Sequence, residues 1–209
     1  MNIFDKLYTD YPKICESKAE IDAAFRRLKK CVSDGGLIMI CGNGGSAADS
    51  EHITGELMKG FNLRRPLSAD EKKLFGGIDG GEDIANKLQG AIRAVSLVSQ
   101  TAVISAFAND IDPALVFAQQ VWGYAEKKSD CLIALSTSGN SKNIVAAAKT
   151  AKAKGIGSIA ITGSKESALS SLCDITIRLP ANTPYEVQEL TLPVYHALCA
   201  ALEAEFFGE

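Results

Sequence analysis

Five short apolar runs, separated by helix-like stretches, constrain the fold of this chain more than any other feature of its sequence. The runs are residues 37–41, 94–98, 131–135, 158–162 and 175–179. They lack the alternation of a half-exposed strand, which is typical of strands buried on both faces. Strands that alternate with helices pair in parallel and are covered by those helices. We therefore predict an α/β protein, a three-layer α/β/α sandwich with a five-stranded parallel sheet.

Helical patterns occupy most of the remaining chain. In residues 18–33, Ile21, Ala24 and Leu28 follow the spacing of an amphipathic helix, and two glycines end the pattern. The other helical stretches run from the loop at residues 42–46 to about residue 59, and over 101–108, 114–127, 143–154, 166–172 and 185–207. Pro193 lies inside the last stretch and removes a backbone hydrogen bond, so we expect a bend there.

The length of 209 residues fits a single domain, 1–209, with its own core. Residues 1–35 are assigned to N-terminal helices of that domain. Residues 63–93 are polar, contain two glycine pairs and show no clean periodicity. Because ordinary connections between elements are much shorter, we predict an insertion here that acts as a lid or as an interface arm.

The composition excludes several classes of protein. Lys and Arg number 22 against 25 for Asp and Glu, so the charge gives no reason to expect nucleic acid or an anionic membrane as a partner. No apolar run is long enough to span a bilayer, and the opening residues do not resemble a signal peptide. The six cysteines form no CxxC pair, which favours reduced thiols over metal knuckles or disulfides. We expect a cytoplasmic protein.

Two loops follow strand-like runs and are suited to an anion. Residues 42–46 (GNGGS) allow close approach of the backbone to a ligand, and residues 136–141 (STSGNS) offer several hydroxyls beside a helix start. The first loop fits a dinucleotide fingerprint, but no acid ends the next strand, and no Lys-Ser or Lys-Thr follows as in a P-loop. Either loop could also be a plain turn and helix cap. Together they favour a phosphorylated small molecule.

The two histidines of the chain both have chemically active neighbours. His52 and Glu56 are four residues apart on one predicted helix, and Gln188 and His196 are eight apart on another, so each pair shares a face. These side chains could hold a divalent ion such as zinc, or could supply a base and an acid for proton transfer beside a carbonyl. The plain structural interpretations are a solvated ion pair for His52 and a core histidine for His196.

Four segments carry a resemblance to a known family. They are CGNGGSAADSEHITGEL (41–57), AND (108–110), LSTSGNSKNI (135–144) and VQELTLPVYH (187–196). Their sequences and their order resemble the SIS (sugar isomerase) family, and within it most closely the phosphoheptose isomerases. The resemblance implies a flavodoxin-like fold and an aldose–ketose isomerase that converts sedoheptulose 7-phosphate to D-glycero-D-manno-heptose 7-phosphate through an enediol. It also implies a homotetramer with active sites between subunits.

The resemblance also implies a role for each candidate residue. Glu56 would be the base and His196 the acid. A zinc ion would be held by His52, Glu56, Gln188 and His196. The sugar phosphate would be held by Ser136, Thr137, Ser138 and Ser141. The rest of the substrate would contact Asn43, Gly44, Gly45, Ser46, Asn109, Asp110 and Gln188.

Two alternatives to this activity are open at the level of sequence. A non-catalytic SIS adaptor, of the type that regulates replication initiation, would keep both loops but would not need the His52, Glu56, Gln188 and His196 set. An isomerase of a different phosphosugar, such as a pentose or hexosamine phosphate, would keep all four. Residues 63–93 are longer than the corresponding segment of the best-known members, so substrate access or assembly would differ at that segment.

Overall fold

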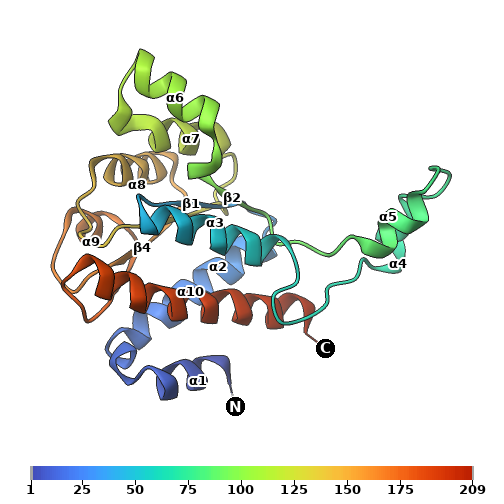
Figure 1. The fold of residues 1–209 in the computed structure, drawn as a ribbon, viewed down its shortest axis with the longest axis horizontal. Coiled ribbons are helices and arrows are strands. Elements are labelled where there is room, and N and C mark those ends of the chain that lie inside the picture. Colours follow the sequence, from blue (N-terminus) through green and yellow to red (C-terminus); the bar gives the residue numbers. More distant parts are fainter. Residues whose placement is uncertain (1, 209) are drawn as a thin grey trace.

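The computed structural model describes residues 2–208, which form one parallel five-stranded sheet between two helical layers (Figure 1). The strand order is β2-β1-β3-β4-β5, and every neighbouring pair is parallel. The strands are β1 (Ile38–Cys41), β2 (Ala94–Ser96), β3 (Cys131–Leu135), β4 (Gly157–Thr162) and β5 (Ile175–Arg178). The predicted three-layer architecture and its five-stranded sheet are therefore confirmed.

The helices were also mostly expected from their apolar spacing. The α-helices are α1 (Ile3–Asp10), α2 (Lys18–Ser33), α3 (Gly45–Met58), α4 (Ala69–Lys73), α5 (Gly81–Lys87), α6 (Thr101–Asp110), α7 (Val116–Tyr124), α8 (Lys142–Lys154), α9 (Ala168–Leu172) and α10 (Pro184–Phe207). Three short 3₁₀ helices, η1 (Pro12–Ser17), η2 (Leu97–Ser99) and η3 (Pro113–Leu115), complete the set. Pro193 lies within α10, which continues through it.

Successive residues of each strand face two separate apolar cores. In β1, Ile38 and Ile40 belong to the core that α1, α2, α3 and α10 cover. Met39 and Cys41 belong to the core beneath α7, α8 and α9. Figure 1 shows α1 and α10 on one side of the sheet and α7 and α8 on the other. This alternation explains why the strand sequences are apolar throughout, because both faces are buried.

The predicted boundaries were wrong at three places, each for a local reason. The helix predicted to reach residue 127 ends at Tyr124, because the side chain of Asp130 accepts hydrogen bonds from the backbone N–H groups of Glu126 and Lys127. The helix predicted from residue 166 starts at Ala168, because Ser167 caps it. The strand predicted over 94–98 ends two residues early, where η2 begins.

Residues 66–89 form an arm that extends away from the three layers (Figure 1). It consists of α4, capped by Ser68, and α5, and an antiparallel bridge between Pro66 and Gln89 closes its root. Leu74 and Ile78, at and near its tip, are largely exposed. The sequence predicted an insertion here but neither helix, because each is too short to show a period. Its role as a lid or an interface arm stays a prediction.

Two properties of the described residues bear on the expected class of protein. No helix within residues 2–208 combines the length and the hydropathy needed to cross a membrane. All six cysteines are free thiols, and burial raises the pKa of Cys31 and Cys173 to about 11. Such thiols stay protonated and inert at neutral pH, as expected for structural cysteines.

Candidate active site

The two predicted ligand loops meet at the carboxyl ends of adjacent strands. β1 lies between β2 and β3. After β1 the chain continues to β2 at one edge of the sheet, and after β3 it continues to β4 toward the other edge. Ligands of open α/β proteins bind at this kind of switch point. The side-chain amides of Asn43, after β1, and Asn143, at the start of α8, exchange two hydrogen bonds of 2.9 Å. The two loops are therefore joined into one rim.

The serine loop after β3 is arranged around the start of α8. Ser136 is buried, and its hydroxyl donates to the hydroxyl of Ser141 over 3.2 Å. Ser141 occupies the N-cap of α8 without a side-chain hydrogen bond to the helix backbone. Thr137 and Ser138 line a pocket with Lys165, which follows β4. Hydroxyls and helix N–H groups at such a terminus suit a phosphate, and the sequence did not identify Lys165 as a neighbour.

The glycine loop after β1 is shaped by close contact with α10. Gly44 has a φ of +56° and precedes the first turn of α3, a conformation that side chains other than glycine rarely adopt. A Cβ on Gly45 would lie only 2.6 Å from Nε2 of Gln188. Gln188 therefore lies directly against the loop, and a larger residue at position 45 would push it away. Ser46 is buried beneath the same loop.

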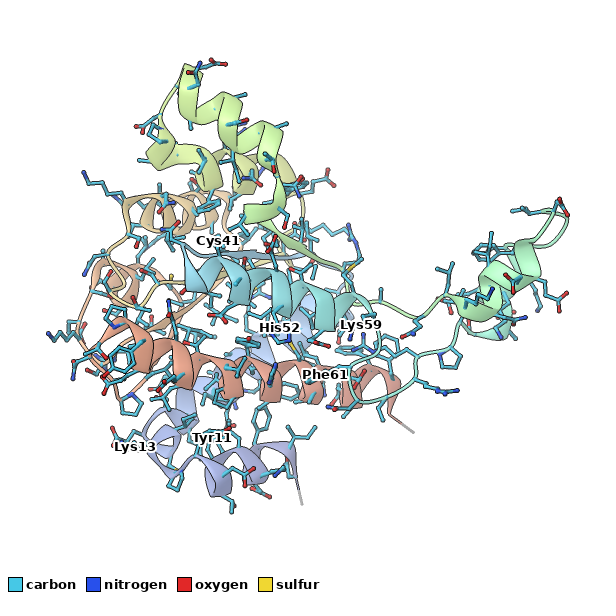
Figure 2. All side chains as sticks on the ribbon, viewed as in Figure 1. Tyr11, Lys13, Cys41, His52, Lys59 and Phe61 are labelled. Atoms are coloured by element: carbon cyan, nitrogen blue, oxygen red, sulfur yellow. The ribbon has the colours of Figure 1, made fainter. Side chains whose placement is uncertain are left out.

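His52 and Glu56 form the predicted pair on the face of α3 that looks toward α10. Nε2 of His52 lies 3.2 Å from Oε1 of Glu56. The other carboxylate oxygen of Glu56 lies 2.9 Å from Nζ of Lys59. Figure 2 shows His52 between α3 and α10, with Lys59 and Phe61 at the end of α3. The Glu56 side chain is mostly buried, whereas that of His52 is half exposed. The carboxylate of Glu56 therefore lies between the Lys59 ammonium and the imidazole of His52.

His196 comes from α10 and lies beside His52. The two imidazole centroids are 4.9 Å apart, and the ring of Phe61 lies 5.5 Å from that of His196. Nε2 of His196 is buried and has no hydrogen-bond partner within the described chain. Burial lowers the pKa of His196, the neighbouring His52 lowers it further, and Glu56 opposes both. A buried nitrogen without a partner is free to bind a metal or to exchange a proton with a ligand.

Tyr195 and Asp49 complete the site, and the sequence reasoning missed both. The hydroxyl of Tyr195 lies 3.0 Å from Nδ1 of His52 and 3.3 Å from Oδ1 of Asp49. Burial raises the pKa of Tyr195, so its hydroxyl keeps its proton. Asp49 lies three residues before His52 on the same face of α3, and this spacing was the available signal. No such signal exists in the sequence for Tyr195, because its neighbours in the sequence are mostly apolar and it resembles an ordinary core residue.

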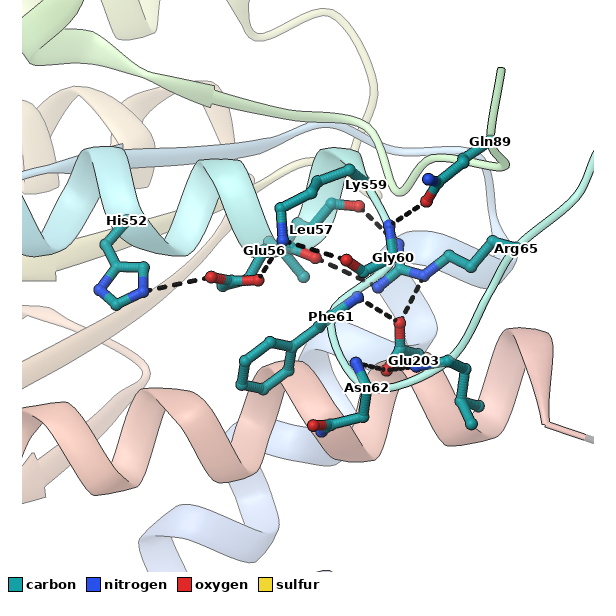
Figure 3. A network of polar contacts seen from close by, with 11 residues as sticks. His52, Glu56, Leu57, Lys59, Gly60, Phe61, Asn62, Arg65, Gln89 and Glu203 are labelled. Atoms are coloured by element: carbon teal, nitrogen blue, oxygen red, sulfur yellow. Dashed lines mark hydrogen bonds and ion pairs between the residues drawn. The ribbon is translucent and has the colours of Figure 1, made fainter. Parts of the chain in front are cut away.

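A buried ion pair holds the loop that follows α3 (Figure 3). The Glu203 carboxylate accepts hydrogen bonds from the backbone N–H groups of Phe61, Asn62 and Leu63, and from Nε of Arg65. Burial raises the pKa of Glu203, but these four hydrogen bonds outweigh that effect and hold it below its usual range. Glu203 on α10 thereby fixes the segment that carries Phe61 to His196.

Arg65 connects the same loop to the backbone of α3. Its guanidinium donates to the carbonyls of Leu57 (2.8 Å) and Glu56 (3.1 Å), and it stacks over the ring of Phe207. A cation at the last carbonyls of a helix is favourable because of the helix dipole. Arg65 also begins the arm, since its carbonyl accepts a hydrogen bond from Gly90. No local pattern in the sequence pairs Arg65 with Glu203.

The structure does not bring Asn109 and Asp110 to this rim. Both side chains are exposed at the end of α6. Within residues 2–208 they form a side-chain hydrogen bond only with each other. Their expected contact with substrate stays a prediction.

The donor set fits zinc in its chemistry. Two imidazoles and a carboxylate converge, and Nε2 of His196 has no partner. Within residues 2–208, however, no three His, Cys, Asp or Glu side chains are already arranged as a metal cluster. Imidazole and carboxylate are donor types that suit zinc, and zinc binding by these residues stays a prediction.

Comparison with known proteins identifies similar domains along most of the chain. A model of the SIS domain matches residues 94–203, and a second SIS domain model matches residues 12–72. Residues 73–93, which contain α5 and the tip of the arm, lie between the two matches.

Curated and solved proteins are similar over nearly the full length. The phosphoheptose isomerase of Akkermansia muciniphila is 30% identical over 199 residues, which cover 95% of this chain and 92% of that protein. Phosphoheptose isomerase 2 of Campylobacter jejuni is 34% identical over 86% of this chain and 77% of its own. The structure of a phosphoheptose isomerase from Francisella tularensis superposes with a TM-score of 0.73 at 25% identity, covering 97% of this chain and 98% of that one.

Proposed function

This chain belongs to the SIS domain family and is an isomerase of the phosphoheptose isomerase group, and from that membership we propose that it interconverts sedoheptulose 7-phosphate and D-glycero-D-manno-heptose 7-phosphate. The observation that carries the proposal is the convergence of His52 and Glu56 from α3 with His196 from α10. A carboxylate and an imidazole at one rim are the groups that proton transfer beside a carbonyl needs.

Glu56 is the base of the proposed reaction. Its carboxylate removes the proton from the carbon next to the carbonyl and returns it to the neighbouring carbon, through an enediol. Nζ of Lys59, 2.9 Å from the carboxylate, keeps a cation beside it while it is ionised.

His196 is the acid of the proposed reaction. Its Nε2 has no hydrogen-bond partner within residues 2–208, so a substrate oxygen can take that position. The imidazole then exchanges a proton with the carbonyl and hydroxyl oxygens as the double bond moves. The ring of Phe61 against His196 limits its movement and excludes water from that side.

Ser136, Thr137, Ser138 and Ser141 bind the phosphate in this proposal. Their hydroxyls lie at the start of α8, whose N–H groups favour an anion. Binding energy at the phosphate orients the reacting carbons at Glu56 without contributing to the chemistry itself. Asn43, Gly44, Gly45 and Gln188 lie between the two ends and contact the sugar chain.

We assign His52, Glu56, Gln188 and His196 as ligands of a zinc ion. When bound, zinc would polarise the carbonyl and stabilise the charge that develops on the enediolate. The side chain of Gln188 lies against Gly45 at the start of α3. The proposed assembly is a homotetramer, in which other subunits add to the rim.

Incubation with sedoheptulose 7-phosphate, with and without a chelator, tests this proposal. Proton NMR of the mixture should show the aldose phosphate appearing, and the chelator should slow its appearance. No conversion of this substrate, combined with conversion of a pentose or hexosamine phosphate, would reassign the substrate. No conversion of any of these sugar phosphates would favour the non-catalytic adaptor, which membership in the isomerases otherwise disfavours.

A further inference from the structure

Tyr195 occupies a position between Asp49 and His52 that the proposed chemistry does not yet use. Its ring is buried in the core beneath α3 and α10 and packs edge-on against the rings of His52 (5.5 Å between centroids) and His196 (4.9 Å). Its hydroxyl lies 3.0 Å from Nδ1 of His52 and 3.3 Å from Oδ1 of Asp49. The imidazole of His52 is half exposed. At its Nδ1 edge it contacts the hydroxyl of Tyr195, whose ring is held in the core.

Counting protons fixes the direction of these two contacts. A tyrosine hydroxyl has one proton to donate, and the carboxylate of Asp49 has none. Both contacts are hydrogen bonds only if Tyr195 donates to Asp49 and Nδ1–H of His52 donates to the tyrosine oxygen. In the neutral ring, Nε2 then carries the lone pair, because a neutral imidazole has a single N–H.

The other ring nitrogen of His52, Nε2, faces the proposed base. Nε2 of His52 is the nitrogen that faces Glu56, at 3.2 Å, and the rim beside His196. If Nε2 carried the proton, it would donate to the carboxylate of Glu56 and occupy an oxygen that the base needs. With the proton on Nδ1, Nε2 and the carboxylate oxygen of Glu56 are two acceptors that face each other at 3.2 Å, an unfavourable contact that a bound cation or a ligand with a proton to donate would relieve. A hydrogen bond on the far nitrogen is the usual way in which a site sets the tautomer of a histidine.

We propose that Tyr195, supported by Asp49, is a positioning residue that holds the proton of His52 on Nδ1 and thereby keeps Nε2 and Glu56 open to the substrate side of the site. This proposal rests on the proposed function for its effect on turnover, but the tautomer itself can be measured without any substrate. Tyr195 does not touch the reacting atoms, so it acts through His52.

Nitrogen-15 NMR of the two histidines measures the tautomer directly. The chain has only His52 and His196, so the spectrum of chelator-treated protein labelled at histidine contains four ring nitrogens, assigned with His196→Gln. The spectrum is recorded at about pH 8, well above the pKa of about 6.5 of a free imidazole. We expect Nδ1 of His52 at the shift of a protonated nitrogen in the wild type. In Tyr195→Phe the proton should move to Nε2, toward Glu56.

Asp49→Ala and Tyr8→Phe serve as a second variant and as a matched control for the measurement of the His52 tautomer. In Asp49→Ala, Tyr195 loses its carboxylate acceptor and donates to Nδ1 instead, so the tautomer should change in the same direction, whether or not Tyr195→Phe folds. The matched control is Tyr8→Phe, which removes another buried tyrosine hydroxyl, one with no partner in the described chain, and should leave the His52 signals unchanged.

Kinetics of the folded variants supply the second measurement. Tyr195→Phe should lower kcat about 10- to 100-fold and leave KM within about twofold, as for the removal of other groups that orient a functional histidine. Wild-type protein with Nδ1 unprotonated, or unchanged His52 signals in Tyr195→Phe, would overturn the proposal. A tautomer change in a protein that isomerises no sugar phosphate would uphold the role of Tyr195 and refute the proposed function instead.

Discussion

The imidazole rings of His52 and His196 lie 4.9 Å apart and at 82° to each other, although they come from helices at opposite ends of the chain. Both belong to one subunit, and Glu56 lies beside His52 in the same subunit. The proposed base and acid are therefore brought together by the packing of α3 on α10, without a contribution from a second copy. Contacts between subunits would add to the rim but are not needed to assemble this pair.

Replacement of the proposed base tests its role in proton transfer. We expect Glu56→Gln to fold and to bind the sugar phosphate, but to lose isomerisation by about 10²- to 10⁴-fold, because an amide cannot accept the proton. Turnover followed by proton NMR and binding followed by calorimetry would separate the two effects. Glu51→Gln, an exposed glutamate on the same helix, is the control and should keep normal turnover. Near-normal turnover in Glu56→Gln would remove Glu56 from the mechanism.

The serine loop predicts a defect in binding. Ser138→Ala combined with Ser141→Ala should raise KM about 10²- to 10⁴-fold, since hydrogen bonds to a charged group contribute about 1.5–3 kcal/mol each and two are removed. The kcat value should change little, because the phosphate lies far from the reacting carbons. Steady-state kinetics checks both values, with Ser105→Ala on the exposed face of α6 as a control. An unchanged KM would place the phosphate elsewhere.

The buried pair of Arg65 and Glu203 predicts a large loss of stability. Glu203→Gln should lower the free energy of unfolding by about 3 kcal/mol, because it leaves a buried guanidinium and three backbone N–H groups without their anion. Urea unfolding measures this loss. Glu205→Gln breaks the half-exposed pair with Lys29 on the same helix and should have an effect below about 1 kcal/mol.

The pH dependence of that loss has a definite sign. The pKa of Glu203 in the folded protein lies below its ordinary value of 4.5. Ionised Glu203 therefore stabilises the fold fully above about pH 4.5, and the contribution is lost as the pH falls through the lower, folded value. We expect the stability difference between wild type and Glu203→Gln to be constant near neutral pH and to shrink in acid. A difference that grows in acid would contradict the inferred direction of the pKa shift.

The arm predicts an effect on assembly. Leu74 and Ile78 are large apolar residues exposed at and near its tip, and α4 and α5 are too short to be stable alone. If the protein forms the proposed homotetramer and the arm is an interface in it, Leu74→Glu combined with Ile78→Glu should dissociate that assembly in light-scattering measurements. The same substitutions at Val103 and Ile111, exposed on α6, are the control. An intact assembly with an altered KM would instead identify the arm as a lid.

The sequence predicts the sheet well because the signal for each strand is local. β1 and β3 have apolar residues on both faces, and the two loops that follow them contain their own glycines and serines. The pair of His52 and Glu56 is likewise set by helical spacing. The juxtaposition with His196 was expected only from the resemblance to a family, since no local pattern relates α3 to α10.

The rest of the site depends on tertiary contacts that no local pattern encodes. Arg65 and Glu203 are each ordinary charged residues in the sequence, and only the packing of α10 against the loop after α3 makes them a buried pair. In the sequence, Tyr195 cannot be distinguished from the other core residues of α10. Only the structure places its hydroxyl beside His52.

Isomerisation in deuterium oxide tests the central claim most directly, because it reports the proton transfer itself. Wild-type enzyme with sedoheptulose 7-phosphate should give aldose phosphate that carries deuterium at C2, as detected by mass spectrometry and NMR. Glu56→Gln should bind the same substrate and incorporate none. Product formed by the wild type without any solvent deuterium, or full incorporation by Glu56→Gln, would contradict an enediol mechanism with Glu56 as the base.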